Sequence, residues 1–334
     1  MLCASFLKGC AALISGIESV TLGVRDLDAA LALLRDVCGM AVESDTRASV
    51  SLLALWGLRP HEDVRLVELS CAGYAFGRIR LAAFPMPLDR HTRRDAGRDA
   101  VDAPTDTGPK ALDLYVSAPL ADAAQALTAA GCRSYGGPVR FRVRDMDTEE
   151  VMLSGPEDVS LLLMVGHRHP PHAQREPPQR ARTSEVATVS VVTADLAATR
   201  RFYAEGLGLA ADGIDDRISG TAARDMRRLF GVADPGDVSL VMLRDPEQPS
   251  GKILAVQFHG APDRPLQSPM RPGNLGIALF STRCPGLETL RDRLTAAGQT
   301  EYLPILHVAL GDGMPARVML ARGPNGELFE FIER

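Results

Sequence analysis

The end of the chain carries a carboxylate in an apolar setting. The sequence closes with GPNGELFEFIER, which predicts a turn over 323–326 and then a short strand. With a side-chain period of two, Glu330 lies on the same face as Leu328 and Ile332. A carboxylate in such a place needs a partner, a metal ion or a proton. Glu330 is therefore the first candidate for chemistry.

Two histidines lie in apolar stretches of the same half of the chain. His259 ends the stretch AVQFHG, and His307 lies within PILHVAL. A histidine beside a desolvated carboxylate forms a reasonable acid–base pair, because each group tunes the other. We predict Glu330 as the catalytic acid or base, assisted by His307 or His259. The alternative is that both histidines are core residues with satisfied hydrogen bonds.

Three further side chains of this half are predicted to contact a ligand. Tyr302 and Arg317 flank the strands around His307, where they would bind a carboxylate or a phenol of the ligand. Surface placement is the alternative for both. Met242, in an apolar strand, is predicted to line the substrate pocket.

The N-terminal half offers polar residues on apolar strands. Asp113 and Tyr115 are two positions apart, so they share a face and form a predicted polar pair. Glu68 shares a face with Val64 and Leu66 and is predicted to be partly buried. A structural role is the alternative for all three polar groups.

The composition limits the class of protein. A chain of 334 residues with 46% hydrophobic residues predicts about two domains. The net charge of −5 and the lack of a basic stripe argue against nucleic acid. Six scattered cysteines without a CxxC motif favour reduced thiols and a cytoplasmic protein, and no apolar run is long enough for a membrane span. Residues 1–16 favour a short packing helix over a signal peptide.

The chain repeats itself. The segment VTLGVRDLDAALALLRDVCGM at Val20 is similar to VSVVTADLAATRRFYAEGLGL at Val189. A second pair of helix ends, LTAAGC and LTAAGQ, is interleaved with the first. The pattern predicts four units, each a strand, a helix and about three strands. Asp26 and Asp195 are predicted to cap the N-termini of helices. Gly131 and Gly298 are predicted to end helices by taking the left-handed backbone conformation.

A segment rich in Pro, Arg and His divides the four units into two pairs. The stretch HRHPPHAQREPPQRARTS lacks periodicity, so its histidines are predicted to lie in a solvated linker rather than a metal site. The predicted organisation is an N-terminal domain over 1–166, a linker over 167–184 and a C-terminal domain over 185–334.

These four ordered units resemble the vicinal oxygen chelate superfamily, which includes glyoxalase I, bleomycin-resistance proteins and extradiol dioxygenases. VTADLAATRRFYAEGLGL and GPNGELFEFIE carry the resemblance, which covers nearly the whole chain. It implies an α+β fold of four βαβββ units in two pairs, each pair a curled mixed sheet around a cavity with helices outside. The metal-ligand positions that it implies are Ser19, Asp113, Thr188 and Gly276 on first strands, and Leu81, Leu162, Ala255 and Glu330 on last strands.

The resemblance would place the working site of a two-domain member in the C-terminal pair. That set would be Thr188, Gly276 and Glu330, in which only Glu330 is a metal ligand. One carboxylate does not hold iron, manganese or zinc, which need three or more protein ligands. We therefore predict no metal and no cofactor, with Thr188 and Gly276 as substrate contacts.

Two classes of function follow from these expectations. The first is a metal-independent enzyme, of lyase, isomerase or cyclase type, that moves a proton on a small carbonyl or aromatic compound. The second is a non-catalytic protein that sequesters a hydrophobic small molecule, with Glu330 as a counter-charge. A metal-dependent dioxygenase or glyoxalase with displaced ligands is a third. In each case the partner is a small molecule, and the protein is a monomer or a homodimer.

Overall fold

The computed structural model contains four similar units of strand and helix. It describes residues 13–71, 74–86, 105–143, 146–168, 177, 181–212, 217–232, 236–248, 250–261, 263–265, 269–299, 302–310 and 313–334. The first unit comprises β1 (Ile17–Val24), α1 (Leu27–Leu31), the π-helix η1 (Ala32–Val37), β2 (Ala41–Arg47), α2 (Val50–Leu55), β3 (Arg65–Ser70) and β4 (Arg78–Ala83). The second comprises β5 (Gly108–Val116), α3 (Leu120–Ala129), β6 (Val139–Val143), β7 (Met146–Ser154), the 3₁₀ turn η2 (Pro156–Asp158) and β8 (Ser160–Arg168).

The second half of the chain repeats this plan. The third unit comprises β9 (Thr183–Val192), α4 (Leu196–Arg200), the π-helix η3 (Arg201–Gly206), β10 (Ala210–Asp212), β11 (Arg217–Ile218), α5 (Gly220–Leu229), β12 (Val238–Arg244) and β13 (Lys252–Phe258). The fourth comprises β14 (Gly276–Arg283), α6 (Leu287–Ala296), β15 (Leu306–Ala309), β16 (Pro315–Arg322) and β17 (Leu328–Glu333). The first and third units carry an extra helix, α2 or α5, that the repeat pattern did not predict.

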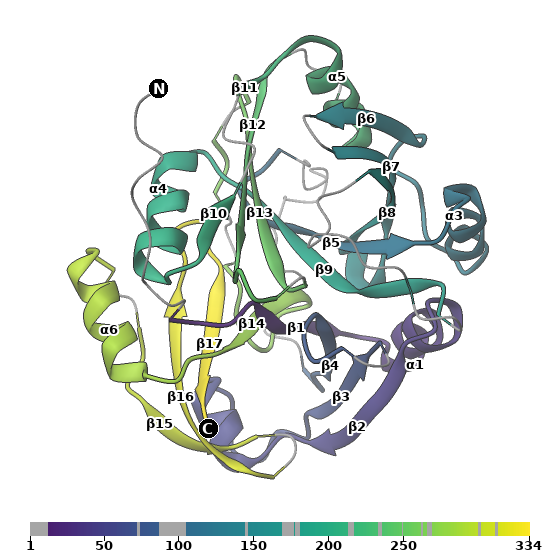
Figure 1. Cartoon of the computed structure of the whole chain (residues 1–334). Coiled ribbons are helices and arrows are strands. Elements are labelled where there is room, and N and C mark those ends of the chain that lie inside the picture. The colour runs from purple at the N-terminus through teal and green to yellow at the C-terminus, as the bar shows by residue number, and fades with distance from the viewer. Residues whose placement is uncertain are drawn as a thin grey trace.

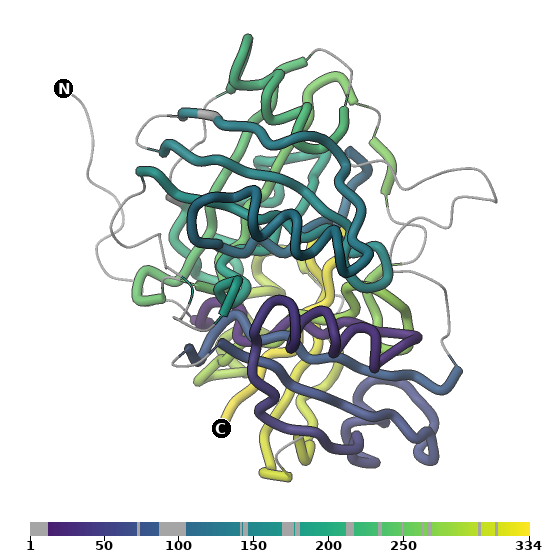
Figure 2. The backbone as a smooth tube through the Cα atoms, turned by 90° about the vertical axis from the view of Figure 1, so that its right-hand side faces the viewer, coloured from purple at the N-terminus to yellow at the C-terminus, as the bar shows by residue number. Residues whose placement is uncertain are grey.

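The strands form two curled mixed sheets, and each sheet joins units that lie far apart in the sequence. Sheet I has the order β15-β16-β17-β14-β1-β4-β3-β2 and contains the first and fourth units. Sheet II has the order β10-β12-β13-β9-β5-β8-β7-β6 and contains the second and third. Figure 1 shows the purple first unit and the yellow fourth unit side by side, and Figure 2 shows them in the same half of the molecule.

The predicted α+β class with two curled mixed sheets is confirmed, but the pairing of units in chain order was wrong. The central contact of sheet I is the antiparallel pair of β1 with β14, and that of sheet II is β5 with β9. Each sheet therefore contains strands from both sides of the segment 167–184, which was predicted to separate two domains. Most of that segment, with His169 and His172, lies outside the described residues, and β8 and β9 take its two ends.

Capping aspartates mark the starts of two helices, and glycines mark the ends of two others. Asp26 and Asp195 accept hydrogen bonds from backbone N–H groups three residues ahead, each at 2.9 Å, as the sequence predicted. Gly131 and Gly298 have φ of +99° and +81°, the left-handed conformation expected beyond a helix end. No helix within the described parts of the chain has the length and apolar character to cross a membrane.

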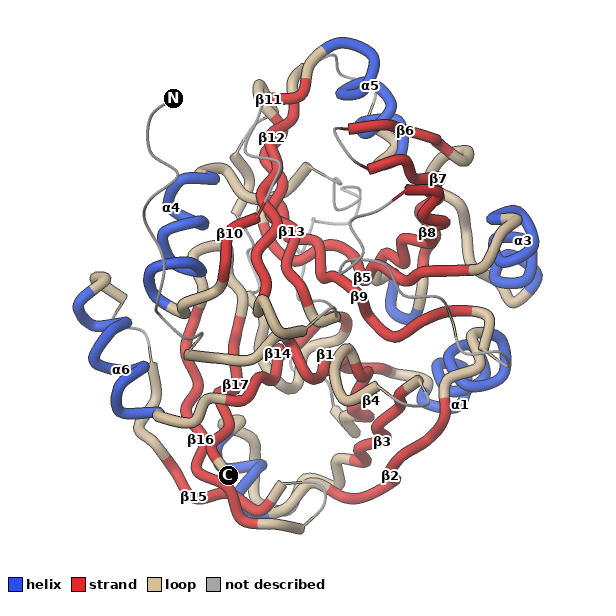
Figure 3. The backbone as a smooth tube through the Cα atoms, viewed as in Figure 1, coloured by secondary structure: helices blue, strands red, loops and turns tan. Residues whose placement is uncertain are grey.

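Helices and aromatic side chains cover the outer face of sheet I. Figure 3 shows α1 and α6 at the periphery of the strands, and they contact β4 and β17 of this sheet. Phe329 points outward and packs against Tyr203 of η3, with ring centroids 5.9 Å apart. Both residues are fully buried. Glu330 neighbours Phe329 on β17 and therefore points to the opposite face. We call this opposite face the inner face of sheet I.

Candidate functional site

The inner face of sheet I holds a cavity of about 730 Å³. We call it the inner cavity. Its volume is in the range of small-molecule pockets in proteins. Its polar lining comes from both halves of the chain, and its apolar lining includes Leu66, Leu310 and Ile332. The charged and hydroxyl residues that line it are Glu18, Ser19, Glu43, Ser44, Thr46, Glu68, Arg78, Arg80, Ser281, Arg283 and Arg334.

Glu330 does not line this cavity itself but binds two residues that do, Arg80 and Ser281. Its Oε2 atom accepts a hydrogen bond from Ser281 Oγ at 2.8 Å and lies 3.3 Å from Arg80 Nη1. Its Oε1 atom accepts from Trp56 Nε1 at 3.3 Å. The carboxylate is fully buried. One guanidinium and two neutral hydrogen-bond donors therefore compensate the buried charge of Glu330, which the sequence analysis had identified on an apolar strand.

Strand register brings these residues together from distant parts of the chain. Ser281 of β14 is opposite Glu330 of β17, and Ser19 of β1 is opposite Ser281. The parallel pair of β1 with β4 then places Arg78 beside Ser19 and Arg80 two residues further along. Because paired residues share a face of the sheet, all of these side chains project to the inner face.

Helix α2 supplies the remaining donor. Ser49 caps the helix by accepting from Leu52 N at 3.1 Å. Leu52, Leu53 and Leu55 are buried, which fixes the helix against the sheet. Trp56 follows at the end of the helix and is 4% exposed, with its N–H directed at Glu330. An apolar helix face thus delivers one polar atom to the carboxylate of Glu330.

Several buried polar atoms of the inner cavity have no hydrogen-bond partner among the described residues. They are Ser19 Oγ, Thr46 Oγ1 and Arg78 Nε. The nearest carboxylate to Arg78 is Glu68, whose Oε1 atom lies 3.6 Å from Arg78 Nη1, so this ion pair uses the other end of the guanidinium. Unsatisfied buried donors and acceptors cost free energy, and a cluster of them in one cavity is therefore unusual.

The charges around the cavity are balanced. Burial raises the pKa of Glu18, although the nearby guanidinium groups of Arg283 and Arg78 oppose this. Desolvation acts to lower the pKa of Arg80, but the charges of Glu330 and Glu68 outweigh it and raise the pKa above its ordinary value. Arg80 is therefore a permanent cation.

The inner cavity does not fit a divalent metal ion. Next to Glu330 it offers Ser19, Arg80 and Ser281, none of which is an ordinary metal ligand, and the guanidinium of Arg80 already neutralises the Glu330 carboxylate. Within the described ranges, no group of three or more His, Cys, Asp or Glu side chains could hold a metal. The donor set here fits a network of hydrogen bonds and ion pairs.

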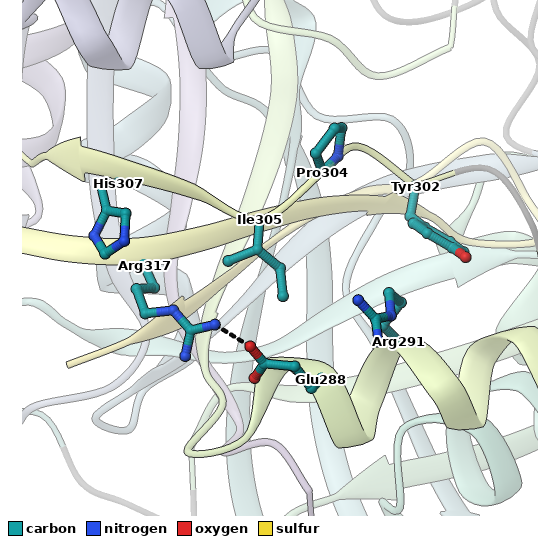
Figure 4. Close-up of a pocket in the computed structure, with 7 residues that line it drawn as sticks. All are labelled: Glu288, Arg291, Tyr302, Pro304, Ile305, His307 and Arg317. Carbon is teal, nitrogen blue, oxygen red and sulfur yellow. Dashed lines mark hydrogen bonds and ion pairs between the residues drawn. The ribbon is translucent and has the colours of Figure 1, made fainter.

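His307, Tyr302 and Arg317 lie together, but on the other face of sheet I. They line an open pocket of about 640 Å³ between β15, β16 and α6 (Figure 4). His307 is opposite Arg317, which is opposite Glu333, and Glu333 is three residues from Glu330 and so on the opposite face. Arg317 is paired with Glu288 and Glu333. The structure therefore does not bring His307 to Glu330.

His259 and Met242 belong to sheet II and also lie away from Glu330. His259 follows β13, where its Nε2 atom is 2.8 Å from Ser239 Oγ. This contact fits the alternative of a histidine with a satisfied hydrogen bond. Met242 lies on β12 opposite Leu254.

Thr188, Gly276 and Glu330 do not form one set. Thr188 is in sheet II, opposite Asp113. Gly276 is at the far end of β14, where it is opposite Gly23. The inner-face position next to Glu330 is taken by Ser281 instead.

Sheet II has a buried polar cluster of its own. Asp113 accepts from Ser190 Oγ at 3.0 Å, and both are at most 2% exposed. Burial, with the charge of Glu150, raises the pKa of Asp113 well above its usual range. Burial raises the pKa of Glu150 to about 7. Asp113 and Tyr115 are both buried, as is every other residue of β5.

Sequence reasoning singled out Ser19 and Glu68, which line the inner cavity, and Glu330, which lies behind its lining. It missed the partners of Glu330. Arg80 lies next to the position at Leu81 that the resemblance implied, so an error of one residue hid it. The signal was the alternation RIRLAA, in which two arginines share one face of a strand. Trp56 had no comparable signal, because its contact with Glu330 spans 274 residues.

Comparison with known proteins supports the fold. Glyoxalase I from Zea mays superposes with a TM-score of 0.58 at 13% sequence identity, covering 95% of this chain and 92% of that one. A proposed dioxygenase from Bacillus subtilis superposes with a TM-score of 0.58 at 11% identity, covering 97% and 86%. No family profile and no curated protein matches the sequence. The chain has the vicinal oxygen chelate fold, as the sequence resemblance implied.

Proposed function

We propose that this protein binds a small organic molecule in the inner cavity, with Glu330 as a fixed counter-charge rather than a proton carrier. The observation that carries the proposal is the environment of Glu330. It is fully buried, it is held by Arg80, Ser281 and Trp56, and it does not line the cavity itself. A carboxylate in this state orients Arg80 and Ser281, which do line the cavity.

Filling the cavity tests the proposal. Ile332 lines the inner cavity, so Ile332→Phe should abolish small-molecule binding. Ile305 lines the pocket between β15, β16 and α6 on the other face of sheet I. Ile305→Phe is therefore the matched control, and this variant should bind normally. Binding is measured by ligand-observed NMR with a library of small organic acids, alcohols and amides, and folding by circular dichroism. Equal binding by both folded variants, or no binding by the native protein, would contradict the proposal.

A proton-transfer enzyme is a second candidate, and Glu68 is the observation that favours it. Its carboxylate lines the inner cavity and lies 3.6 Å from Arg78, beyond hydrogen-bond distance. It therefore keeps lone pairs available for a proton on a bound molecule. In this candidate Glu68, not Glu330, accepts the proton, and Arg78 stabilises the developing negative charge.

The two candidates differ in one measurement. For a ligand found by the NMR experiment, exchange of its carbon-bound hydrogen with deuterium from solvent is followed over time. An enzyme should catalyse this exchange, and Glu68→Gln should abolish it without abolishing binding. Binding without exchange would leave only the first candidate.

A further inference from the structure

The unpartnered polar atoms of the inner cavity point to the chemical class of the ligand. Arg78, Ser19 and Thr46 line the cavity, and their atoms Arg78 Nε, Ser19 Oγ and Thr46 Oγ1 are buried without hydrogen-bond partners among the residues described. Ser19 is 2% exposed and lies beside Arg78 in the register of β1 with β4. A guanidinium edge next to a hydroxyl donor is a recognition site for an oxyanion.

We propose that the ligand is a small carboxylate with a hydroxyl or amino group on the neighbouring carbon. The carboxylate accepts hydrogen bonds from Arg78 Nε and Ser19 Oγ. The neighbouring group donates to Glu68, which lines the same cavity and lies near the other end of the Arg78 guanidinium. This inference rests on the proposed function, because it names the ligand of the same cavity.

The charge around the cavity favours a monoanion. Arg80 is paired with Glu330, and Arg283 is paired with Glu18. Two other arginines, Arg78 and Arg334, line the cavity, and Arg78 Nε has no partner among the described residues. Glu43 and Glu68 line the cavity as well. A doubly charged phosphate would face these carboxylates with little additional compensation, whereas a single carboxylate matches one guanidinium.

The rest of the ligand is apolar. Leu66, Leu310 and Ile332 line the cavity, and Leu66 and Ile332 come from strands on opposite sides of β1. The volume of about 730 Å³ leaves room for a ring or a branched chain beside the carboxylate. 3-Phenyllactate has all the required parts and serves as the probe.

The experiment compares 3-phenyllactate with three analogues. 3-Phenyllactamide lacks the charge, 3-phenylpropionate lacks the hydroxyl, and inorganic phosphate lacks the apolar part. Binding is followed by the fluorescence of Trp56, which is the single tryptophan of the chain and contacts Glu330, the ion-pair partner of the lining residue Arg80. We expect 3-phenyllactate to bind about tenfold or more tightly than either organic analogue, since each lacks one polar contact in a desolvated site.

Variants assign the contacts. Arg78→Gln should remove the preference for the carboxylate over the amide, and Glu68→Met should remove the preference for the hydroxyl. Ser19→Ala should weaken binding without destabilising the fold, because it deletes a hydroxyl that has no partner. Arg65→Gln is the control for lost charge, since Arg65 is paired with Asp45 and does not line the cavity.

The outcomes separate this inference from the proposed function. If 3-phenyllactamide binds as tightly as 3-phenyllactate, and Ile332→Phe blocks both, the proposed function holds because the inner cavity binds small molecules. The proposal of a carboxylate ligand is then wrong. Phosphate binding as tight as that of 3-phenyllactate, lost in Arg78→Gln, would also overturn it. If neither these probes nor the wider library binds in the cavity, the proposed function itself fails.

Discussion

At the scale of single residues, the molecule places its charges in pairs with very different surroundings. Glu330 and Arg80 form a pair in which the carboxylate is fully buried and the arginine side chain is 13% exposed. Loss of one member of a buried pair leaves an uncompensated charge, and the cost depends on how deeply the remaining charge is buried. The two partners are therefore unequal.

Substitutions at this pair should show that inequality. We expect Arg80→Gln to lower the free energy of unfolding by about 3–5 kcal/mol, because it leaves Glu330 buried without a cation. Glu330→Gln should cost less, about 1–3 kcal/mol, because Arg80 still has Glu68 nearby while the new NH2 group faces a donor and leaves one contact unmade. Urea unfolding of both variants and of the double variant checks this. A larger loss in Glu330→Gln would contradict the description of the pair.

The buried carboxyl groups of sheet II should make stability depend on pH. The pKa of Glu150 is raised to about 7 in the folded protein, above its value in the unfolded chain. The folded state then binds more protons than the unfolded state between about pH 4.5 and 7, so stability falls as pH rises through this window. The shift corresponds to a contribution on the order of 3 kcal/mol.

Glu150→Gln should therefore reduce this slope and stabilise the protein above pH 7. The neighbouring Glu149, which is partly exposed, provides the control substitution Glu149→Gln. Thermal unfolding at a series of pH values is the measurement. An unchanged slope in Glu150→Gln would show that this carboxyl group is not the source of the pH dependence.

At the scale of elements, the short helices α2 and α5, which precede β3 and β12, are each followed by a buried aromatic residue. In the first unit, α2 ends at Leu55 and is followed by Trp56, whose N–H reaches Glu330. In the third unit, α5 ends at Leu229 and is followed by Phe230, which is buried beside Phe258 with centroids 5.3 Å apart. The repeated LWG and LFG motifs thus occupy equivalent positions, but only the tryptophan brings a donor.

Replacing Trp56 with phenylalanine separates packing from hydrogen bonding. The ring volume is largely kept while Glu330 loses one donor, so we expect a loss of stability of about 1 kcal/mol. If the two side chains interact, Trp56→Phe should lower the free energy of unfolding by a different amount in the Glu330→Gln protein than in the native protein. A double-mutant cycle in urea measures this coupling, and additive effects would argue against the Trp56 contact.

At the scale of the whole molecule, both sheets are completed only when the two halves of the chain meet. β1 pairs with β14 in sheet I, and β5 pairs with β9 in sheet II. A half expressed alone would present two central strands without their neighbours. Exposed strand edges of this kind favour association or unfolding.

Separate expression tests whether the halves are independent domains. We expect residues 1–166 and residues 185–334 each to lack a cooperative unfolding transition as isolated monomers, and to form a folded complex when mixed. Size-exclusion chromatography and circular dichroism during urea unfolding provide the readout. A monomeric half that unfolds cooperatively would establish it as an autonomous domain.

The sequence alone determined the local features of this protein. The repeats identified four units, and residues a few positions apart identified the helix caps at Asp26 and Asp195, because short-range hydrogen bonds depend only on neighbouring positions. The period of two marked Glu330 as a carboxylate on an apolar strand that requires a partner.

Only the tertiary structure decided which partner that is. Arg80 and Trp56 are separated from Glu330 by 250 and 274 residues, and the choice depends on which unit pairs with which. The four units have similar patterns, so periodicity allows the first unit to pair with the second as well as with the fourth. Packing of β1 against β14 selects the fourth, and this selection gives Glu330 its cation and creates the inner cavity.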